Sequence, residues 1–149
     1  MTRFCFTVDL DRDVNIPVPG RRAAGSIDRG SGDLPRFSSS ISGLETLVGI
    51  LDETGMPCTF FCEGRTMEMI SDRAGLLDGF EIGLHGYDHE DMSGLTRQEA
   101  VGVLEDGISA IRDATGRTPV CFRAPYMRPP DDLAHVLPQV GIRMDSSLY

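Results

Sequence analysis

The sequence lacks three features that would assign it to a nucleic-acid-binding, membrane or secreted class. Its formal net charge of −9 over 149 residues excludes the basic surface that nucleic acids or anionic membranes require. No apolar run approaches the roughly 20 residues of a membrane span. The first apolar run leads directly into acidic residues without a cleavage site, so no signal peptide is expected. We therefore expect no nucleic-acid and no membrane partner, while an oligomer stays compatible with the sequence.

The cysteines are also informative through what they do not form. They are Cys5, Cys58, Cys62 and Cys121, and no two make a C-x-x-C pair, which argues against a zinc ribbon. They lie in the apolar runs FCF, CTFFC and VCF, where cysteine behaves as a small hydrophobic residue. We interpret them as reduced thiols, which predicts a cytoplasmic protein.

Apolar runs of strand length alternate with helical signals along the whole chain, whose length suits one domain. Capping boxes at Ser42 and Thr96 predict the starts of two helices, and helical segments are also expected over 65–77 and 131–140. The five expected strands are RFCFTVD, CTFFCEG, FEIGLH, TPVCFRAP and IRMDSS. This alternation predicts an α/β fold, with a parallel sheet or barrel and helices as crossovers.

A long segment rich in glycine, proline and arginine, residues 14–37, separates the first expected strand from the first helix. Loops of this length without periodicity are usually functional or disordered. Its arginines are most simply solubilising charge. The alternative is a lid that attracts an anionic or polar substrate, because an arginine fork binds a carboxylate or phosphate.

Ionisable residues follow every expected strand at its carboxyl end, which is where chemistry collects in parallel α/β folds. We expect these side chains to converge on one rim, which a purely solvent-facing set of loops does not predict. They are Asp9, Asp11, Glu63, His85, Arg123 and Asp145.

The segment HGYDH places His85 and His89 four residues apart, so both rings point the same way in a helical turn. A zinc protease needs a glutamate beside the first histidine, and Gly86 excludes that class. Two histidines and a distant carboxylate can still make a three-ligand site that activates water. Asp9 and Asp11 share one strand face, so one can bind metal while the other takes a proton. The ordinary alternative is a polar loop.

The order of the motifs TVDLD, HGYDH, FRAPY and MDSSLY resembles the polysaccharide deacetylase family, the NodB-homology domains of carbohydrate esterase family four. The resemblance extends from Phe4 to Tyr149 and implies one catalytic domain over residues 1–149. It implies a distorted or partial (β/α) barrel of parallel strands. Because the family barrel has more than five strands, we expect the C-terminal strands to be missing and the domain to be C-terminally truncated.

The resemblance also implies a role for each matching residue. Asp9 is implied to be the catalytic base, and Arg123 to pair with it and hold it ionised. The backbone N–H of Tyr126 is implied to stabilise the oxyanion. Asp145 is implied to tune a catalytic histidine. The implied ligands of a divalent metal ion, with zinc as the expected ion, are Asp11, His85 and His89.

Three departures from the commoner family pattern widen the range of functions. Leu10 separates two aspartates that are adjacent in T-F-D-D, and Gly86 replaces a serine or threonine. Both are features of a variant branch that includes peptidoglycan deacetylase homologues, allantoinase-like enzymes and cyclic imidases. The Leu–His element that supplies the general acid is expected after Asp145, and His135 lies on the wrong element.

The implied activity is metal-dependent hydrolysis of non-peptide carbon–nitrogen bonds, with an N-acetylated sugar as the first expected substrate. The partner is then a carbohydrate or small-molecule substrate. The alternatives are a cyclic amide or imide hydrolase, and a non-catalytic metal- or ligand-binding relic without the general acid. An iron oxygenase with two histidines and one carboxylate is disfavoured by the β/α alternation and by the R-x-P-Y element.

Overall fold

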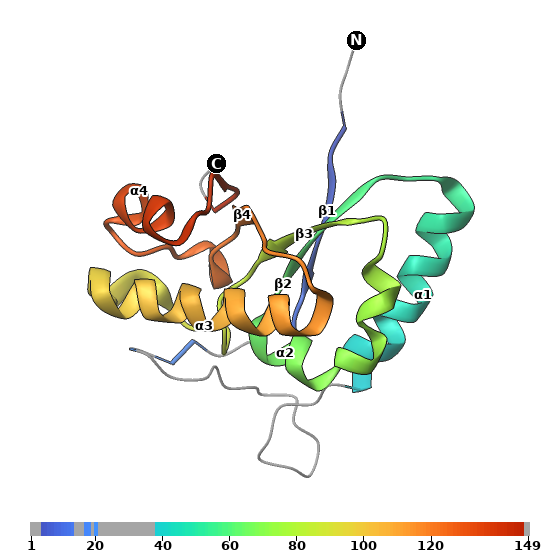
Figure 1. Cartoon of the computed structure of the whole chain (residues 1–149), viewed down its shortest axis with the longest axis horizontal. Helices are drawn as coiled ribbons and strands as arrows, with labels where there is room; N and C mark the ends of the chain where they lie inside the picture. Colours follow the sequence, from blue (N-terminus) through green and yellow to red (C-terminus); the bar gives the residue numbers. More distant parts are fainter. Residues whose placement is uncertain (1–3, 14–16, 19, 21–37, 148–149) are drawn as a thin grey trace.

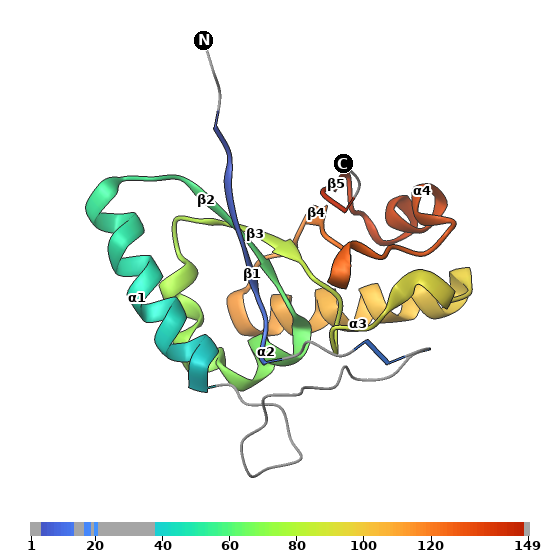
Figure 2. The same cartoon turned by 180° about the vertical axis from the view of Figure 1, so that it is seen from behind.

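The computed structural model describes residues 4–13, 17–18, 20 and 38–147. Five strands form one sheet in the order β1-β2-β3-β4-β5, and every neighbouring pair is parallel (Figures 1 and 2). Sequential parallel strands are the wall of a (β/α) barrel, which confirms the expected fold class. Within the described residues β1 and β5 are its two open edges. The strands are β1 Phe6–Leu10, β2 Cys58–Cys62, β3 Glu81–Leu84, β4 Cys121–Phe122 and β5 Met144–Asp145.

The helices connect these strands and cover the sheet. Helix α3 packs against α2, η1, α4 and η4, while α1 packs against η1. Both views of the ribbon place α1 and α4 at opposite ends of the molecule (Figures 1 and 2). The α-helices are α1 Ser38–Thr54, α2 Gly64–Met69, α3 Arg97–Thr115 and α4 Leu133–Val136, and the 3₁₀ helices are η1 Ser71–Leu77, η2 Met92–Gly94, η3 Pro125–Met127 and η4 Leu137–Val140.

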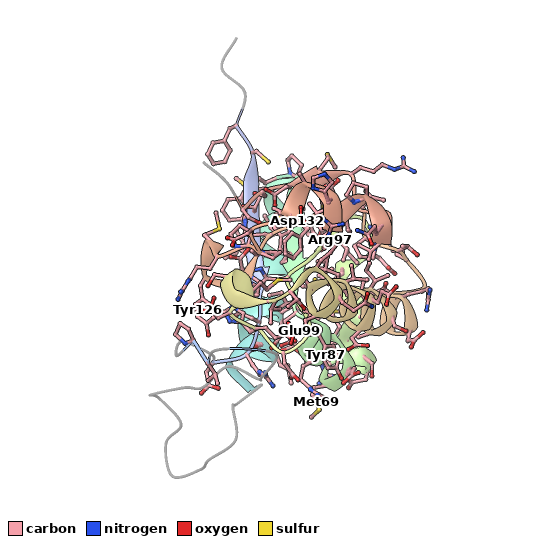
Figure 3. All side chains as sticks on the ribbon, turned by 90° about the vertical axis from the view of Figure 1, so that its left-hand side faces the viewer. Met69, Tyr87, Arg97, Glu99, Tyr126 and Asp132 are labelled. Carbon is pink, nitrogen blue, oxygen red and sulfur yellow. The ribbon has the colours of Figure 1, made fainter. Side chains whose placement is uncertain are left out.

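The start of α3 is the capping box that the sequence predicts. The hydroxyl of Thr96 accepts the N–H of Glu99, and the Glu99 carboxylate accepts the N–H of Thr96. Gly116 ends the helix in the left-handed conformation, with φ of 71°. In Figure 3 Arg97, in the first turn of α3, lies beside Asp132, with which it forms an ion pair that ties this helix to α4.

Two helix predictions are wrong in detail. Helix α1 already includes Ser38, so Ser42 lies inside the helix and does not cap it. The segment 65–77 is not one helix, because Ile70 leaves helical geometry and separates α2 from η1. The change to a 3₁₀ helix keeps both Ile70 and Leu77 in the core. Apolar spacing alone does not distinguish a continuous α-helix from an α-helix followed by a tighter turn.

The last two strands are much shorter than expected. β4 and β5 have two residues each, whereas runs of eight and six residues were expected. Pro119 and Pro125 flank β4, and proline donates no ladder hydrogen bond, which limits that strand from both sides. Both residues of β5 are exposed, in contrast to the wholly buried β4.

The core supports the carboxyl ends of the central strands. All five residues of β2 are buried, as expected for a parallel strand covered on both faces. Gly83 on β3 leaves room for the Phe61 ring, because a Cβ there would lie 2.5 Å from a ring carbon. Phe61 in turn contacts the site described below. In the part of the chain that the structure describes, no helix combines the length and the apolar character of a membrane span.

The long loop predicted over residues 14–37 lies outside the described residues, apart from 17–18 and 20, and so does Tyr149. The lid proposed for that loop stays a prediction.

Candidate metal and catalytic site

Three potential metal ligands meet where β1 and β3 end. Asp11 follows β1, and His85 follows β3, with its N–H donating to the carbonyl of Cys62 at 2.8 Å. The ladder therefore continues to the first histidine and fixes its backbone. His89 comes from the turn that follows, where its φ of 54° is left-handed. Such backbone conformations are costly for residues other than glycine and cluster at functional sites.

The spacing of the three side chains suits one metal ion. Asp11 Oδ2 lies 3.1 Å from His89 Nε2 and 3.9 Å from His85 Nε2. One ligand atom from each of the three residues lies within 4.8 Å of the others. Both imidazoles are buried, whereas the carboxylate is partly exposed towards the opening. Two imidazoles and a carboxylate are a donor set that zinc accepts in catalytic sites.

The hydrogen bond of His85 orients it as a ligand. Its Nδ1 lies 2.8 Å from the carbonyl oxygen of Arg123, so Nδ1 carries the proton and the lone pair of Nε2 is available to a metal ion. Burial lowers the pKa of His85, against the opposing effect of Asp9. The neutral imidazole that a metal ion requires is therefore favoured. These residues fit a divalent ion.

Asp9 is held by an arginine on the other side of the site. Arg123 Nη1 lies 2.7 Å from Asp9 Oδ1, and Nη2 donates to Thr7 Oγ1 at 3.0 Å and Ser146 Oγ at 2.8 Å. The guanidinium also lies over the Phe61 ring, 4.2 Å from its centroid. Asp9 Oδ2 also lies 3.9 Å from His85 Nε2, although Asp9 is outside the group of three residues whose ligand atoms lie together.

Tyr126 forms part of the opposite wall. Its ring meets the His89 ring edge to face at 4.5 Å, and its backbone is left-handed, with φ of 57°. Burial, and next the charge of Asp11, raises the pKa of Tyr126 to about 12. Tyr87 does not line the site: in Figure 3 it lies apart from Tyr126, and its hydroxyl donates to Glu68. The hollow at the site has a volume of about 320 Å³ and is lined by Asp9, Asp11, His85, His89, Ala124, Tyr126 and Met127.

The structure does not bring Asp145 into this hollow. Its carboxylate accepts hydrogen bonds from the N–H and Oγ of Ser147, at 3.1 and 2.6 Å. Ser147 Oγ in turn accepts the N–H of Ala124 at 2.7 Å, which gives only an indirect connection. Asp145 lines a separate hollow beside Leu133 and Leu137. Its implied role in tuning a histidine stays a prediction.

Sequence reasoning missed a buried polar network beneath the ligands. Arg12 pairs with Asp88 and with Glu63, which follows β2; Glu63 was expected on the rim but is wholly buried and does not line the hollow. Burial raises the pKa of Glu63 to about 7, while Arg12 and Thr66 oppose the shift. No sequence pattern marks Arg12, because an arginine after a strand is ordinarily exposed. His135, by contrast, is exposed and contacts Asp132 at the start of α4.

Comparison with known proteins finds similarity to polysaccharide deacetylases. Residues 23–144 match the family model described as polysaccharide deacetylase. A peptidoglycan deacetylase-like protein of Gibberella zeae is 37% identical over 110 residues, which cover 71% of this chain and 32% of that protein. A peptidoglycan deacetylase of Helicobacter pylori is 29% identical over 108 residues, covering 71% and 37%. The chain thus spans about a third of the length of these relatives.

Solved structures agree with the fold. One described as a polysaccharide deacetylase from Mycobacterium smegmatis has a TM-score of 0.76 at 28% identity, covering 97% of this chain and 50% of that chain. A CE4 family pseudoenzyme from Bacillus anthracis has a TM-score of 0.65 at 24% identity, covering 70% and 38%. The second likeness concerns the fold alone.

Proposed function

Because the chain belongs to the polysaccharide deacetylase family, we propose that it acts in metal-dependent hydrolysis of a non-peptide carbon–nitrogen bond, as an N-deacetylase of an N-acetylated sugar. The observation that carries the proposal is the convergence of Asp11, His85 and His89 on one point, with one ligand atom from each within 4.8 Å. Asp9, oriented by its ion pair with Arg123, stands beside them.

A divalent ion, which we propose to be zinc, would supply Lewis-acid activation of a water molecule when held by Asp11, His85 and His89. Asp9 then accepts the proton of that water on its carboxylate, while Arg123 keeps the carboxylate in place. The backbone N–H of Tyr126 donates to the oxyanion that develops on the substrate carbonyl.

Acetate release tests this proposal. The full chain, loaded with zinc, is incubated with N-acetylglucosamine oligomers and assayed beside Asp9→Asn. We expect acetate from the wild type and a loss of roughly 10²–10⁴ in rate for the variant, the usual contribution of general acid–base catalysis. No acetate from metal-loaded wild type would refute deacetylation of this substrate. Turnover of a hydantoin instead would favour the cyclic amide alternative.

A second candidate is a metal-binding relic without turnover. The observation that favours it is the lack of a further histidine in the hollow among the described residues, since His135 is exposed and contacts Asp132. This candidate predicts that the chain binds the metal ion stoichiometrically but hydrolyses neither an N-acetylated sugar nor a cyclic amide. Stoichiometric metal with measurable turnover would exclude it.

We also propose a cytoplasmic location. Cys58, Cys62 and Cys121 are buried and unpaired, and burial raises the pKa of the Cys62 thiol, so it stays protonated and unreactive. Free thiols of this kind suit a reducing compartment. Fractionation of cells expressing the tagged chain tests the proposal, and recovery outside the cytoplasm would contradict it.

A further inference from the structure

The residue that follows the proposed ligand Asp11 is a buried arginine. The side chain of Arg12 is 5% exposed, and its Nε lies 3.1 Å from Oε1 of Glu63, which is wholly buried. Glu63 also accepts the backbone N–H of Arg12 at 3.4 Å and the hydroxyl of Thr66. A buried ion pair contributes little net stability compared with apolar residues of the same size. Net stability alone therefore does not explain why a buried ion pair directly follows the proposed ligand Asp11.

Arg12 also reaches the segment that carries the second histidine. Its Nη2 donates to the carbonyl oxygen of Asp88 at 3.1 Å and to Asp88 Oδ1 at 3.2 Å. Asp88 immediately precedes His89, just as Arg12 immediately follows Asp11. One side chain thus connects the backbone next to one proposed ligand with the backbone next to another.

The histidine turn needs such an anchor. His89 has a φ of 54°, and a left-handed residue other than glycine costs about 1–3 kcal/mol, so it persists only where its surroundings hold it. The carbonyl that Arg12 holds belongs to the peptide unit directly before His89. A lysine cannot replace these contacts, because its single ammonium does not reproduce the planar fork.

We propose that Arg12 is a positioning residue for the metal centre, which fixes the spacing between Asp11 and His89 by binding Glu63 and Asp88 at once. The inference rests on the proposed metal-binding function. The change in metal affinity that this role predicts on substitution of Arg12 is opposite in sign to that of a simple charge effect. Removing a nearby positive charge should tighten the binding of a cation, whereas loss of positioning should weaken it.

Arg65 provides a matched control. It holds the same Asp88 carboxylate from the outer side, with Nε 3.0 Å from Oδ1 and Nη2 3.2 Å from Oδ2, and its side chain is 37% exposed. Arg65→Gln therefore removes the same charge as Arg12→Gln, together with an ion pair to the same partner. It leaves the connection between Arg12 and the backbone of Asp88 in place.

The experiment measures the dissociation constants of Zn²⁺ and Co²⁺ for the full chain by chelator competition, with the melting temperature of the metal-free protein beside them. The variants are Arg12→Lys, Arg12→Gln, Arg65→Lys and Arg65→Gln. We expect Arg12→Lys to raise the dissociation constant roughly 10- to 100-fold, the usual effect of losing a residue that orients a ligand. The dissociation constants of both Arg65 variants should stay within about fivefold of the wild-type value, which is the largest usual contribution of an exposed ion pair.

Arg12→Lys keeps the charge, so it decides the question even if Arg12→Gln fails to fold. Arg12→Lys binding metal as tightly as wild type would overturn the inference, even if its melting temperature falls, because the arginine would then serve only the fold. Tighter binding by Arg12→Gln would overturn it as well. Wild type that binds no metal would refute the proposed function together with this inference, whereas normal wild-type binding with unaffected Arg12→Lys refutes the inference alone.

Discussion

Gly86 replaces the serine or threonine of the commoner histidine motif, and the structure explains why a side chain is excluded there. Its φ is 72°, and a Cβ at this position would lie 3.0 Å from Oε2 of Glu90 and 3.1 Å from Cγ of Pro125. Glu90 is buried and accepts the N–H of Tyr87 at 3.0 Å, so its carboxylate occupies the space inside the turn. We predict that Gly86→Ala destabilises the protein.

The size of the effect follows from two contributions. Left-handed backbone costs a residue with a Cβ about 1–2 kcal/mol. The Glu90 carboxylate must shift to make room for the Cβ, and weakening the hydrogen bond that it accepts from Tyr87 costs up to the net value of such a bond, about 0.5–1.5 kcal/mol. The free energy of unfolding should thus fall by about 1.5–3.5 kcal/mol. At about 2–4 °C per kcal/mol for a chain of this size, the melting temperature should fall by roughly 3–14 °C.

Thermal unfolding of the metal-free chain measures this effect without involving metal affinity. Gly49→Ala is the control, because Gly49 lies within the regular helix α1 and a Cβ there has no atom within 4 Å. That change should be neutral or stabilising by up to about 1 kcal/mol. The melting temperature of Gly86→Ser should fall at least as far as that of Gly86→Ala, since both substitutions add the Cβ. Melting of Gly86→Ala within about 2 °C of wild type, less than 1 kcal/mol on this scale, would refute the reasoning.

Three further predictions concern the proposed roles and the start of α3. Asp11→Asn should weaken metal binding by removing a charged ligand, while Asp9→Asn should retain the metal, as measured by competition titration; the opposite pattern would mean that the two roles are reversed. His89→Ala should lose most bound zinc in elemental analysis, and stoichiometric zinc in that variant would refute the ligand set. Thr96→Ala should lower the free energy of unfolding by about 1 kcal/mol in urea, because the cap of Glu99 is lost; an unchanged midpoint would show that the capping box adds nothing.

Much of the fold could be predicted because its signals are local. The Thr96 capping box and the apolar run of β2 each depend on a few neighbouring residues, and both match the structure. The predictions of element boundaries were wrong where residues distant in sequence determine the local structure. The break at Ile70 and the shortness of β5 depend on how the segment packs against the rest of the chain. Such tertiary effects override local propensity.

The same distinction applies to the site. The rule that parallel strands end on one rim places Asp9, Asp11 and His85 together, because it needs only strand direction and register. It does not predict which strand ends face the hollow, and Asp145, on an exposed edge strand, does not line it. Nor does it reveal that Arg12 is buried, since the burial of a charge depends on distant partners.

Arg123 contributes to the site through its side chain and through its backbone carbonyl, and a substitution changes only the first of these. Its side chain pairs with Asp9, and its carbonyl oxygen accepts the Nδ1–H of His85. Every amino acid supplies that carbonyl, so a library of single substitutions at position 123 would register only the partner of Asp9. The choice of imidazole tautomer would pass unnoticed in such a library, because it is determined by the path of the main chain.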